Sequence, residues 1–403
     1  MVGIIGILAF IGVAWLLCDN KAAICWRTIG VALAIQVGIG VIVFGLPPGR
    51  AALGWLSDRA LDVIGAGKAG TDFLFGSLTA DQSPVGFVFA LQVLPMIVFF
   101  SALIAVLYYL GIMQWVIRLI GGGLQKLLGT SRAESLSTAA DIFVGQTEAP
   151  LVIKPYIPHL TSSELFAVMV AGLASVAGSV MAGYAAMGVK MEYLLAASFM
   201  AAPGSLLFAK LMKPETAVPT EEVALAFAEA DEAPENVLDA AAHGASTGLK
   251  LALNVGAMLL AFIGLIALLN LMLGGLCNWC HLPHLSLQGI LGWLFAPVAW
   301  LAGIPAAEMR QGGSLIGQKL VLNEFVAYVE LAGIQAAMTA KTRAICSVAL
   351  CGFANFSSIA ILLGGLGGMA PTRRAEIARF GLRAVAAGTL SNLTSAAILG
   401  LFV

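Results

Sequence analysis

The chain has 403 residues, of which 60% are hydrophobic and 11% are charged, and its mean hydropathy is +0.96. A soluble domain carries about 25% charged residues, so this composition excludes a soluble protein and indicates an all-α polytopic membrane protein. The formal net charge of −1 leaves no excess of basic residues, and we therefore expect no nucleic-acid partner.

Apolar runs of about 20 residues mark the membrane helices. No basic segment leads the first run, so we expect no cleavable signal peptide and interpret this run as the first span. About eight spans are predicted, near residues 2–17, 29–46, 86–111, 164–187, 192–212, 249–275, 344–368 and 380–403. Residues 47–85 mix apolar and charged side chains, which favours amphipathic helices along a surface. The placement of Lys and Arg predicts that both termini lie outside.

Two stretches are apolar enough to enter the membrane but are interrupted by polar residues. The first, 130–160, contains the segment Gly145–Pro150, and the second, 290–332, contains Pro305–Gly313 and then Asn323–Val326. Non-helical backbone at membrane depth is tolerated only inside protein or beside a cavity, so both stretches are predicted to be re-entrant hairpins.

Each predicted hairpin is followed by a helix rich in small residues with polar groups at its middle, at 172–180 and at 352–359. A repeated hairpin and helix is typical of an inverted-repeat transporter whose hairpins have opposite orientations. We therefore divide the chain into five parts. They are scaffold helices with an amphipathic segment (1–111), the first half of a transport domain (112–212), an acidic cytoplasmic linker (213–248), a scaffold helix with an outer loop (249–288) and the second half of the transport domain (289–403).

The polar side chains of these segments should meet near the membrane midplane. A charged group there costs roughly 2.5–3.5 kcal/mol on insertion scales, so it is retained where it has a partner or a function. The set consists of Asp141, Gln146, Thr147, Glu148, Ser175, Glu324, Asn355 and Ser358. It contains no basic residue, which disfavours an anionic ligand and favours a neutral polyhydroxylated one such as a sugar or nucleoside. Phe353 could lie against a planar ring.

Catalysis and ATP-driven transport fit the sequence poorly. No His accompanies a Ser or Cys in a triad-like arrangement, and no GxxxxGK loop is present. A hydrolase using Glu148 and Glu324 as acid and base is a weaker alternative. The segment Cys277–His281 formally matches a haem attachment site, but we interpret it as a loop. Energy should therefore come from an ion gradient. Oxygen atoms of Asp141, Val144, Ser175 and Val176 could surround a hard cation.

Four motifs together are similar to those of the concentrative nucleoside transporters, over nearly the whole chain. They are Gly145–Pro150, Asn323–Ala327, Gly352–Ala360, and Gly121–Lys126 with Thr130–Ser135. The resemblance implies a homotrimer in the lipid of a bacterial inner membrane. Each protomer would have eight helices and two hairpins, and its transport domain would move like an elevator against a trimeric scaffold.

The resemblance also implies roles for individual residues. The nucleobase would be held by Gln146, Thr147 and Glu148. The ribose hydroxyls would be held by Glu324, Asn355 and Ser358, with Val180 and Phe353 lining the pocket. Sodium, the coupling ion and the only cofactor implied, would be bound by Asp141, Val144, Ser175 and Val176.

One position departs from the family pattern, because sodium-dependent members typically carry Asn where this chain has Asp141. A carboxylate could strengthen a sodium site, take up a proton itself, or impair coupling. We favour sodium, because Ser175 and the small residues around it remain. Gly145 leaves room for purines, which predicts broad or pyrimidine-leaning selectivity. The predicted function is sodium-driven import of uridine, other pyrimidine nucleosides and adenosine, with proton coupling as the alternative.

Overall fold

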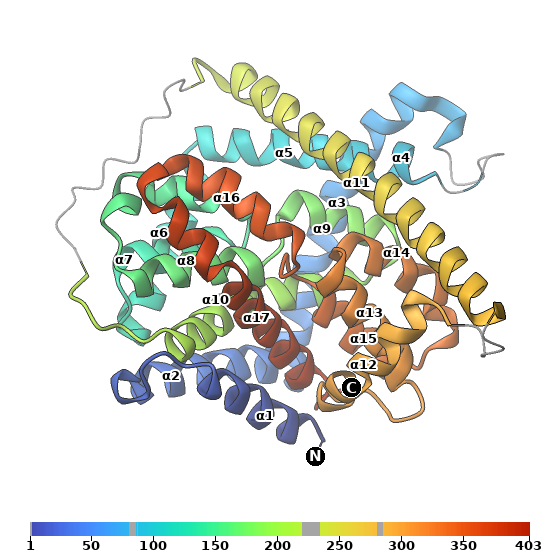
Figure 1. The fold of residues 1–403 in the computed structure, drawn as a ribbon. Coiled ribbons are helices and arrows are strands. Elements are labelled where there is room, and N and C mark those ends of the chain that lie inside the picture. The colour runs from blue at the N-terminus through green and yellow to red at the C-terminus, as the bar shows by residue number, and fades with distance from the viewer. Residues whose placement is uncertain (1, 80–85, 87, 220–233, 280–284) are drawn as a thin grey trace.

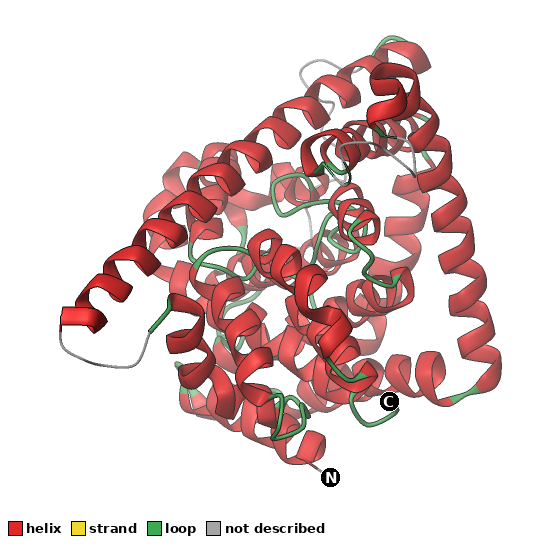
Figure 2. Ribbon diagram, turned by 90° about the vertical axis from the view of Figure 1, so that its right-hand side faces the viewer, coloured by secondary structure: helices red, strands yellow, loops and turns green. Residues whose placement is uncertain are grey.

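The computed structural model describes residues 2–79, 86, 88–219, 234–279 and 285–403. Within these residues every regular element is a helix, as Figure 2 shows. The predictions of an all-helical fold and of a multi-pass membrane protein are therefore confirmed.

The helices follow one another along the chain with short connections. The first half contains α1 (Val2–Leu16), α2 (Trp26–Gly40), α3 (Pro47–Phe75), α4 (Phe89–Gln92), α5 (Leu94–Tyr109), α6 (Ile112–Leu128), α7 (Arg132–Ala140), the 3-10 helix η4 (Ala149–His159), α8 (Ser162–Ala174), α9 (Gly178–Ala186) and α10 (Met191–Met212). The second half contains α11 (Val237–Trp279), α12 (Leu287–Leu301), α13 (Met309–Val321), α14 (Glu324–Ile334), α15 (Ala340–Leu350), α16 (Ser357–Met369) and α17 (Arg374–Leu399). Single turns occur at η1 (Lys21–Ala23), η2 (Val41–Gly45), η3 (Gly76–Leu78), η5 (Gln335–Ala337) and η6 (Pro371–Arg373).

Each of the eight predicted apolar runs falls on one of these helices or on a consecutive pair. Five segments of the described chain are long and apolar enough to cross a membrane: Trp26–Gly45, Phe89–Tyr109, Ser162–Ala186, Met191–Met212 and Val237–Gly275. Three shorter apolar helices, α1, α12 and α16, accompany them. Two predicted spans are broken in the middle, the first between α8 and α9 and the second between α15 and α16.

Three segments differ from the prediction or fall outside the description. Residues Pro47–Phe75 of the amphipathic stretch form one helix of 29 residues, α3, which starts at Pro47 because proline is well suited to a first helical turn. Residues 80–85 of that stretch lie outside the described residues. The last part of the predicted linker, from Val237, belongs to α11. Residues 220–233 of that linker, and Cys280 and His281 of the possible haem motif, lie outside the described residues.

The second polar stretch contains two turns where we predict one. A turn around Pro305 joins α12 to α13, which pack against each other. A further break at Leu322 and Asn323 separates α13 from α14, because the Asn323 side chain accepts a hydrogen bond from the Val326 N–H at 2.9 Å and caps a new helix. Glu324 therefore lies at the start of α14, beside this second turn.

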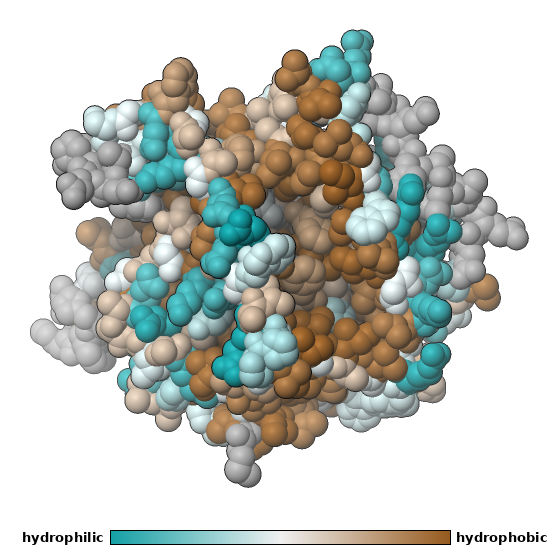
Figure 3. All heavy atoms as spheres, turned by 180° about the vertical axis from the view of Figure 1, so that it is seen from behind, coloured by the Kyte–Doolittle hydropathy of each residue, from teal (hydrophilic) through white to brown (hydrophobic). Residues whose placement is uncertain are grey.

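The core of the molecule lies around α8, α9 and α10. In the apolar 18-residue part of Ser162–Ala186, 94% of the residues are buried, and in that of Met191–Met212 the share is 89%. In the corresponding parts of Phe89–Tyr109 and Val237–Gly275, only 17% of the residues are buried. Figure 1 shows the long helix α11 alongside α5, at the edge of the molecule. Figure 3 shows extensive apolar surface on one face of the molecule, as expected for a protein whose outside meets lipid or other subunits.

Candidate substrate and cation site

The turns of the two hairpins meet the two broken helices through backbone hydrogen bonds. In the first half, the Gly178 N–H donates to the Phe143 carbonyl at 2.9 Å. In the second half, the Phe356 N–H donates to the Leu320 carbonyl at 3.1 Å. The same kind of contact thus occurs in both halves, which agrees with the expected internal repeat.

A third backbone hydrogen bond joins the two halves to each other. The Phe353 N–H, in the break between α15 and α16, donates to the Ser175 carbonyl at 3.1 Å, in the break between α8 and α9. A helix end leaves N–H and carbonyl groups without intrahelical partners, so the two breaks supply polar backbone to the interior of the protein. These three hydrogen bonds therefore bring together all the segments that carry predicted site residues, namely the two hairpin turns and the two helix breaks.

The residues predicted to hold the nucleobase lie on the turn between α7 and η4. Gln146 is buried, and its Oε1 atom has no hydrogen-bond partner among the described residues. Glu148 accepts a hydrogen bond from the Gly145 N–H at 3.3 Å, which bends the turn back on itself. A Cβ atom at Gly172 of α8 would come within 2.8 Å of the Gln146 Cβ, so only glycine lets this turn approach so closely.

The residues predicted to hold the ribose form a connected network in the second half. The Glu324 carboxylate accepts a hydrogen bond from Asn355 Nδ2 at 2.8 Å and from the Tyr184 hydroxyl at 3.3 Å. The Asn355 Oδ1 atom accepts from the Ser358 N–H at 2.8 Å and from the Ser357 hydroxyl at 2.7 Å. Both oxygens of the carboxylate are thus held in place, each by a donor from a broken helix.

Tyr184 is a member of this network that the sequence analysis misses. It lies on α9, one helical turn after Val180, and therefore on the same side of that helix. Its ring stacks on Tyr328 of α14 with centroids 4.1 Å apart. The spacing from Val180 is a signal that could have identified it.

Phe353 lies in the break between α15 and α16, close to the turn of the first hairpin. Its ring is half-buried, and a Cβ atom built on Gly145 would be 4.0 Å from Phe353 Cε2. Val180 is 1% exposed at the start of α9. The turn of the first hairpin and the second break are therefore close enough for one ligand to touch both.

The residues predicted to bind the cation include a carboxylate with no partner. Asp141 is 1% exposed, and neither of its oxygens accepts a hydrogen bond from any described residue. Asp141 and Ser175 line one small buried space. An unpaired buried carboxylate is costly, so it calls for a bare cation or a proton.

Three hydroxyl groups that the sequence analysis does not include line the same space. Thr138 lies one turn before Asp141 on α7, and Ser198 and Ser205 lie two turns apart on α10. Val144 and Val176, whose carbonyls are predicted ligands, are also buried. Hydroxyl and carboxylate oxygens are the donors that a hard cation prefers, so this set fits sodium. The roles assigned to the individual site residues remain predictions.

Models of known protein families match most of the chain. A model described as Na+ dependent nucleoside transporter C-terminus matches residues 193–400, and its N-terminal counterpart matches residues 5–78. A third model, described as nucleoside recognition, matches residues 90–191, which include the first hairpin.

Relatives and solved structures agree with these models. The chain is 49% identical to the nucleoside permease NupC of Helicobacter pylori, over 99% of this chain and 97% of that protein. It is 38% identical to sodium/nucleoside cotransporter 1 of Mus musculus, over 100% of this chain and 63% of that protein. The structure of CNTnw in an inward-facing substrate-bound state has a TM-score of 0.96 and 55% identity, over 100% of this chain and 97% of that chain. The chain therefore belongs to the concentrative nucleoside transporter family, whose members are transporters and not enzymes.

Proposed function

We propose that this protein imports nucleosides into the cell across a bacterial inner membrane by symport with sodium. Its proposed substrates are uridine, other pyrimidine nucleosides and adenosine. The observation that carries this proposal is the buried carboxylate of Asp141, whose oxygens have no partner among the described residues. It lies on the same turn as Gln146 and Glu148, so a cation bound there would be adjacent to the nucleoside.

In the proposed nucleoside site, the polar groups divide by the part of the ligand that they contact. Gln146, Thr147 and Glu148 offer amide, hydroxyl and carboxylate groups to the edge of a base. Glu324, Asn355 and Ser358 offer acceptors and donors to ribose hydroxyls, with Val180 and Phe353 beside them. Because Asn355 and Tyr184 already hold Glu324, the carboxylate is oriented before the ribose arrives, which lowers the ordering cost of binding.

In the proposed cation site, sodium is bound by the carboxylate of Asp141, the hydroxyl of Ser175 and the carbonyls of Val144 and Val176. The site lies where α8 ends, and the C-terminal end of a helix carries a partial negative charge that favours a cation. Binding of sodium compensates the Asp141 charge and holds the hairpin turn against α8. A hairpin turn held in that position would present Gln146 and Glu148 to the base.

We propose that transport occurs by an elevator movement within a homotrimer. The buried block around α8, α9 and α10 would move, and the exposed helices α5 and α11 would belong to the stationary scaffold. CNTnw has been solved in an inward-facing state and variants of it in intermediate and outward-facing states, and this chain has 55% identity to each. These related states support a mechanism of alternating access.

Uptake by proteoliposomes tests the proposal directly. The purified protein is reconstituted, and accumulation of labelled uridine is followed with an inward sodium gradient at equal pH on both sides. A second set of vesicles has a proton gradient and choline in place of sodium. We expect accumulation above equilibrium only with the sodium gradient. Accumulation that ignores sodium and follows the proton gradient would assign the unpartnered Asp141 carboxylate to proton coupling, which is the second candidate.

A further inference from the structure

A buried cation that belongs to the protein itself lies behind the site. Lys319 of α13 is 2% exposed, and among the described residues it forms no ion pair. Its Nζ atom donates hydrogen bonds to the Ala349 carbonyl at 2.9 Å and to Asn392 Oδ1 at 2.7 Å. A buried ammonium group costs several kcal/mol of desolvation, so its contacts must offset that cost.

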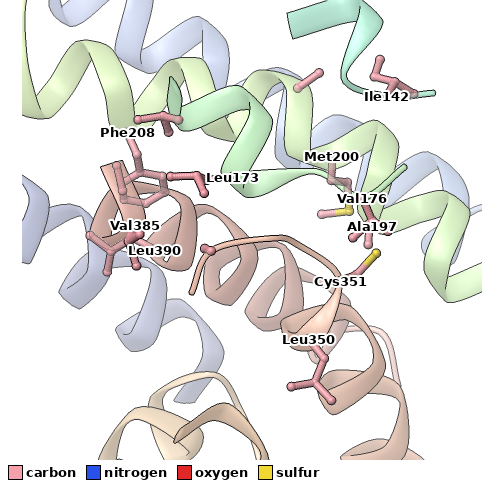
Figure 4. Close-up of a cluster of buried hydrophobic side chains, with 14 of the residues drawn as sticks. Ile142, Leu173, Val176, Ala197, Met200, Phe208, Leu350, Cys351, Val385 and Leu390 are labelled. Atoms are coloured by element: carbon pink, nitrogen blue, oxygen red, sulfur yellow. The ribbon is translucent and has the colours of Figure 1, made fainter. Parts of the chain in front are cut away.

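Asn392 of α17 extends this contact to both broken helices. Its Nδ2 atom donates to the Ala174 carbonyl at 2.6 Å, where α8 ends, and to the Cys351 carbonyl at 3.0 Å, where α15 ends. One amide thus connects Lys319 to the two helix ends that border the proposed cation and nucleoside sites. Figure 4 shows Leu173 and Val176 from the first break in one apolar cluster with Leu350 and Cys351 from the second.

Two glycines leave no spare room around this amide. A Cβ atom at Gly352 would come within 2.3 Å of Asn392 Oδ1 and 2.8 Å of the Ala174 carbonyl oxygen. A Cβ atom at Gly388, one turn before Asn392, would come within 3.2 Å of Leu173 and Ala354. Because the packing is this tight, we expect a shift of the end of α8 to displace the end of α15, and the reverse.

The position of the Lys319 ammonium group in the second half of the chain corresponds to that of the proposed sodium ion in the first half. The contact of Phe356 with Leu320 repeats that of Gly178 with Phe143, and Lys319, next to Leu320, lies in the last turn of α13 beside the second hairpin turn. Its Nζ atom lies at the C-terminal end of α15, as the proposed sodium lies at the C-terminal end of α8. The partial negative charge of a helix C-terminus stabilises a cation in both places.

We propose that Lys319 and Asn392 are positioning residues that couple the cation site to the nucleoside site. Sodium bound at the break between α8 and α9 fixes the direction of the Ala174 carbonyl. Asn392, which is hydrogen-bonded to that carbonyl, is fixed with it and in turn orients the Cys351 carbonyl and the Lys319 ammonium group. Asn355 follows Cys351 by four residues and Glu324 follows Lys319 by five, so the ribose-binding groups are ordered with them. This inference rests on the proposed sodium-coupled function. Coupling between two sites is reciprocal, so it can be measured from either one.

The test measures how much sodium strengthens uridine binding. Calorimetric titration of the purified, full-length protein with uridine is carried out in saturating sodium and in choline. The wild-type protein should bind uridine more tightly in sodium, by a factor within the roughly 5- to 150-fold range typical of coupled sites. Lys319→Met removes the ammonium group, and Asn392→Asp keeps an acceptor for Lys319 but removes both N–H donors. In each variant we expect the sodium enhancement to fall to about twofold or less.

Thr394→Val is the matched control, because Thr394 is a fully buried polar residue of α17 whose hydroxyl has no partner among the described residues. It should keep the wild-type enhancement. A merely structural role would lower the melting temperature or the folded yield without changing the enhancement ratio. Wild-type enhancement in a folded Lys319 or Asn392 variant would overturn the coupling role and leave the proposed function intact. Absence of any sodium effect in the wild-type protein would overturn sodium coupling, and this inference with it.

Discussion

The two hairpin turns each hold a buried carboxylate, but the two carboxylates have opposite surroundings. Glu324 accepts hydrogen bonds from Asn355 and Tyr184, whereas Asp141 accepts none from the described residues. A carboxylate whose oxygens are already held is prepared for repeated, directional contact with a neutral ligand. A carboxylate left without donors is unstable until a cation or a proton joins it. The difference suggests that Glu324 recognises the nucleoside, whereas Asp141 binds the coupling ion.

Replacing Glu324 should have the largest effect on nucleoside binding. Glu324→Ala removes an acceptor of ribose hydroxyls and leaves Asn355 Nδ2 without its partner. A hydrogen bond to a charged group contributes about 1.5–3 kcal/mol, so uridine affinity in saturating sodium should fall by roughly 10- to 150-fold. Titration calorimetry measures this directly.

The control for that variant is another carboxylate of the same helix. Glu330→Ala alters α14 two turns later, where Glu330 contacts the Ser314 hydroxyl at the outer limit of hydrogen bonding, 3.5 Å. It should leave uridine affinity nearly unchanged. Equal losses in both variants would show that α14 needs its carboxylates for stability, and the ribose role of Glu324 would be abandoned.

Replacing Asp141 should affect the cation and spare the nucleoside. Asp141→Asn keeps the shape of the side chain and removes its charge, and ligand charge is a main determinant of affinity for hard cations. We expect the sodium concentration for half-maximal uridine binding to rise by about tenfold, or about 1.4 kcal/mol. Uridine affinity in saturating sodium should stay within about twofold of wild type.

The opposite result for Asp141→Asn would be equally informative. A variant that gains sodium dependence while losing uptake driven by a proton gradient would identify Asp141 as the proton carrier of the wild-type protein. Measurements with both gradients in the same vesicle preparation separate the two outcomes. In either case the comparison with Glu324 is sharpened, because replacing Glu324 should lower uridine affinity in saturating sodium without changing which ion drives uptake.

Much of this arrangement could be predicted from the sequence, because membrane helices leave strong local signals. The apolar runs locate the spans, and polar groups such as Glu148 and Asn355 stand out within them. The break at Asn323 is less visible, since one capping asparagine in a helical pattern is a weak signal. Its consequence is large, because it places Glu324 at a turn.

Other parts of the site could not be predicted, because they depend on contacts between residues far apart in the chain. Asn392 lies in an apolar helix with small polar neighbours, and only the fold brings it to Ala174 and Cys351. Lys319 resembles an ordinary basic residue near the end of a helix until burial distinguishes it. No basic residue is therefore predicted in the site from the sequence, whereas the structure places the Lys319 ammonium group behind it.

The smallest predicted effect tests whether Glu324 is held by its neighbours before the ligand arrives. Tyr184→Phe removes the hydroxyl that contacts Glu324 Oε1 at 3.3 Å and keeps the ring that stacks on Tyr328. A neutral donor contributes about 0.5–1.5 kcal/mol, so uridine affinity should fall by roughly 2- to 13-fold. Tyr328→Phe is the matched control, because its hydroxyl donates to the Ser347 carbonyl at 2.7 Å instead. Sodium affinity should be equal in both variants, since neither hydroxyl touches Asp141. If both variants bind uridine with the same affinity, the Tyr184 hydroxyl has no role in binding. Asn355 alone then orients Glu324, and Glu324 differs from Asp141 by one hydrogen-bond donor instead of two.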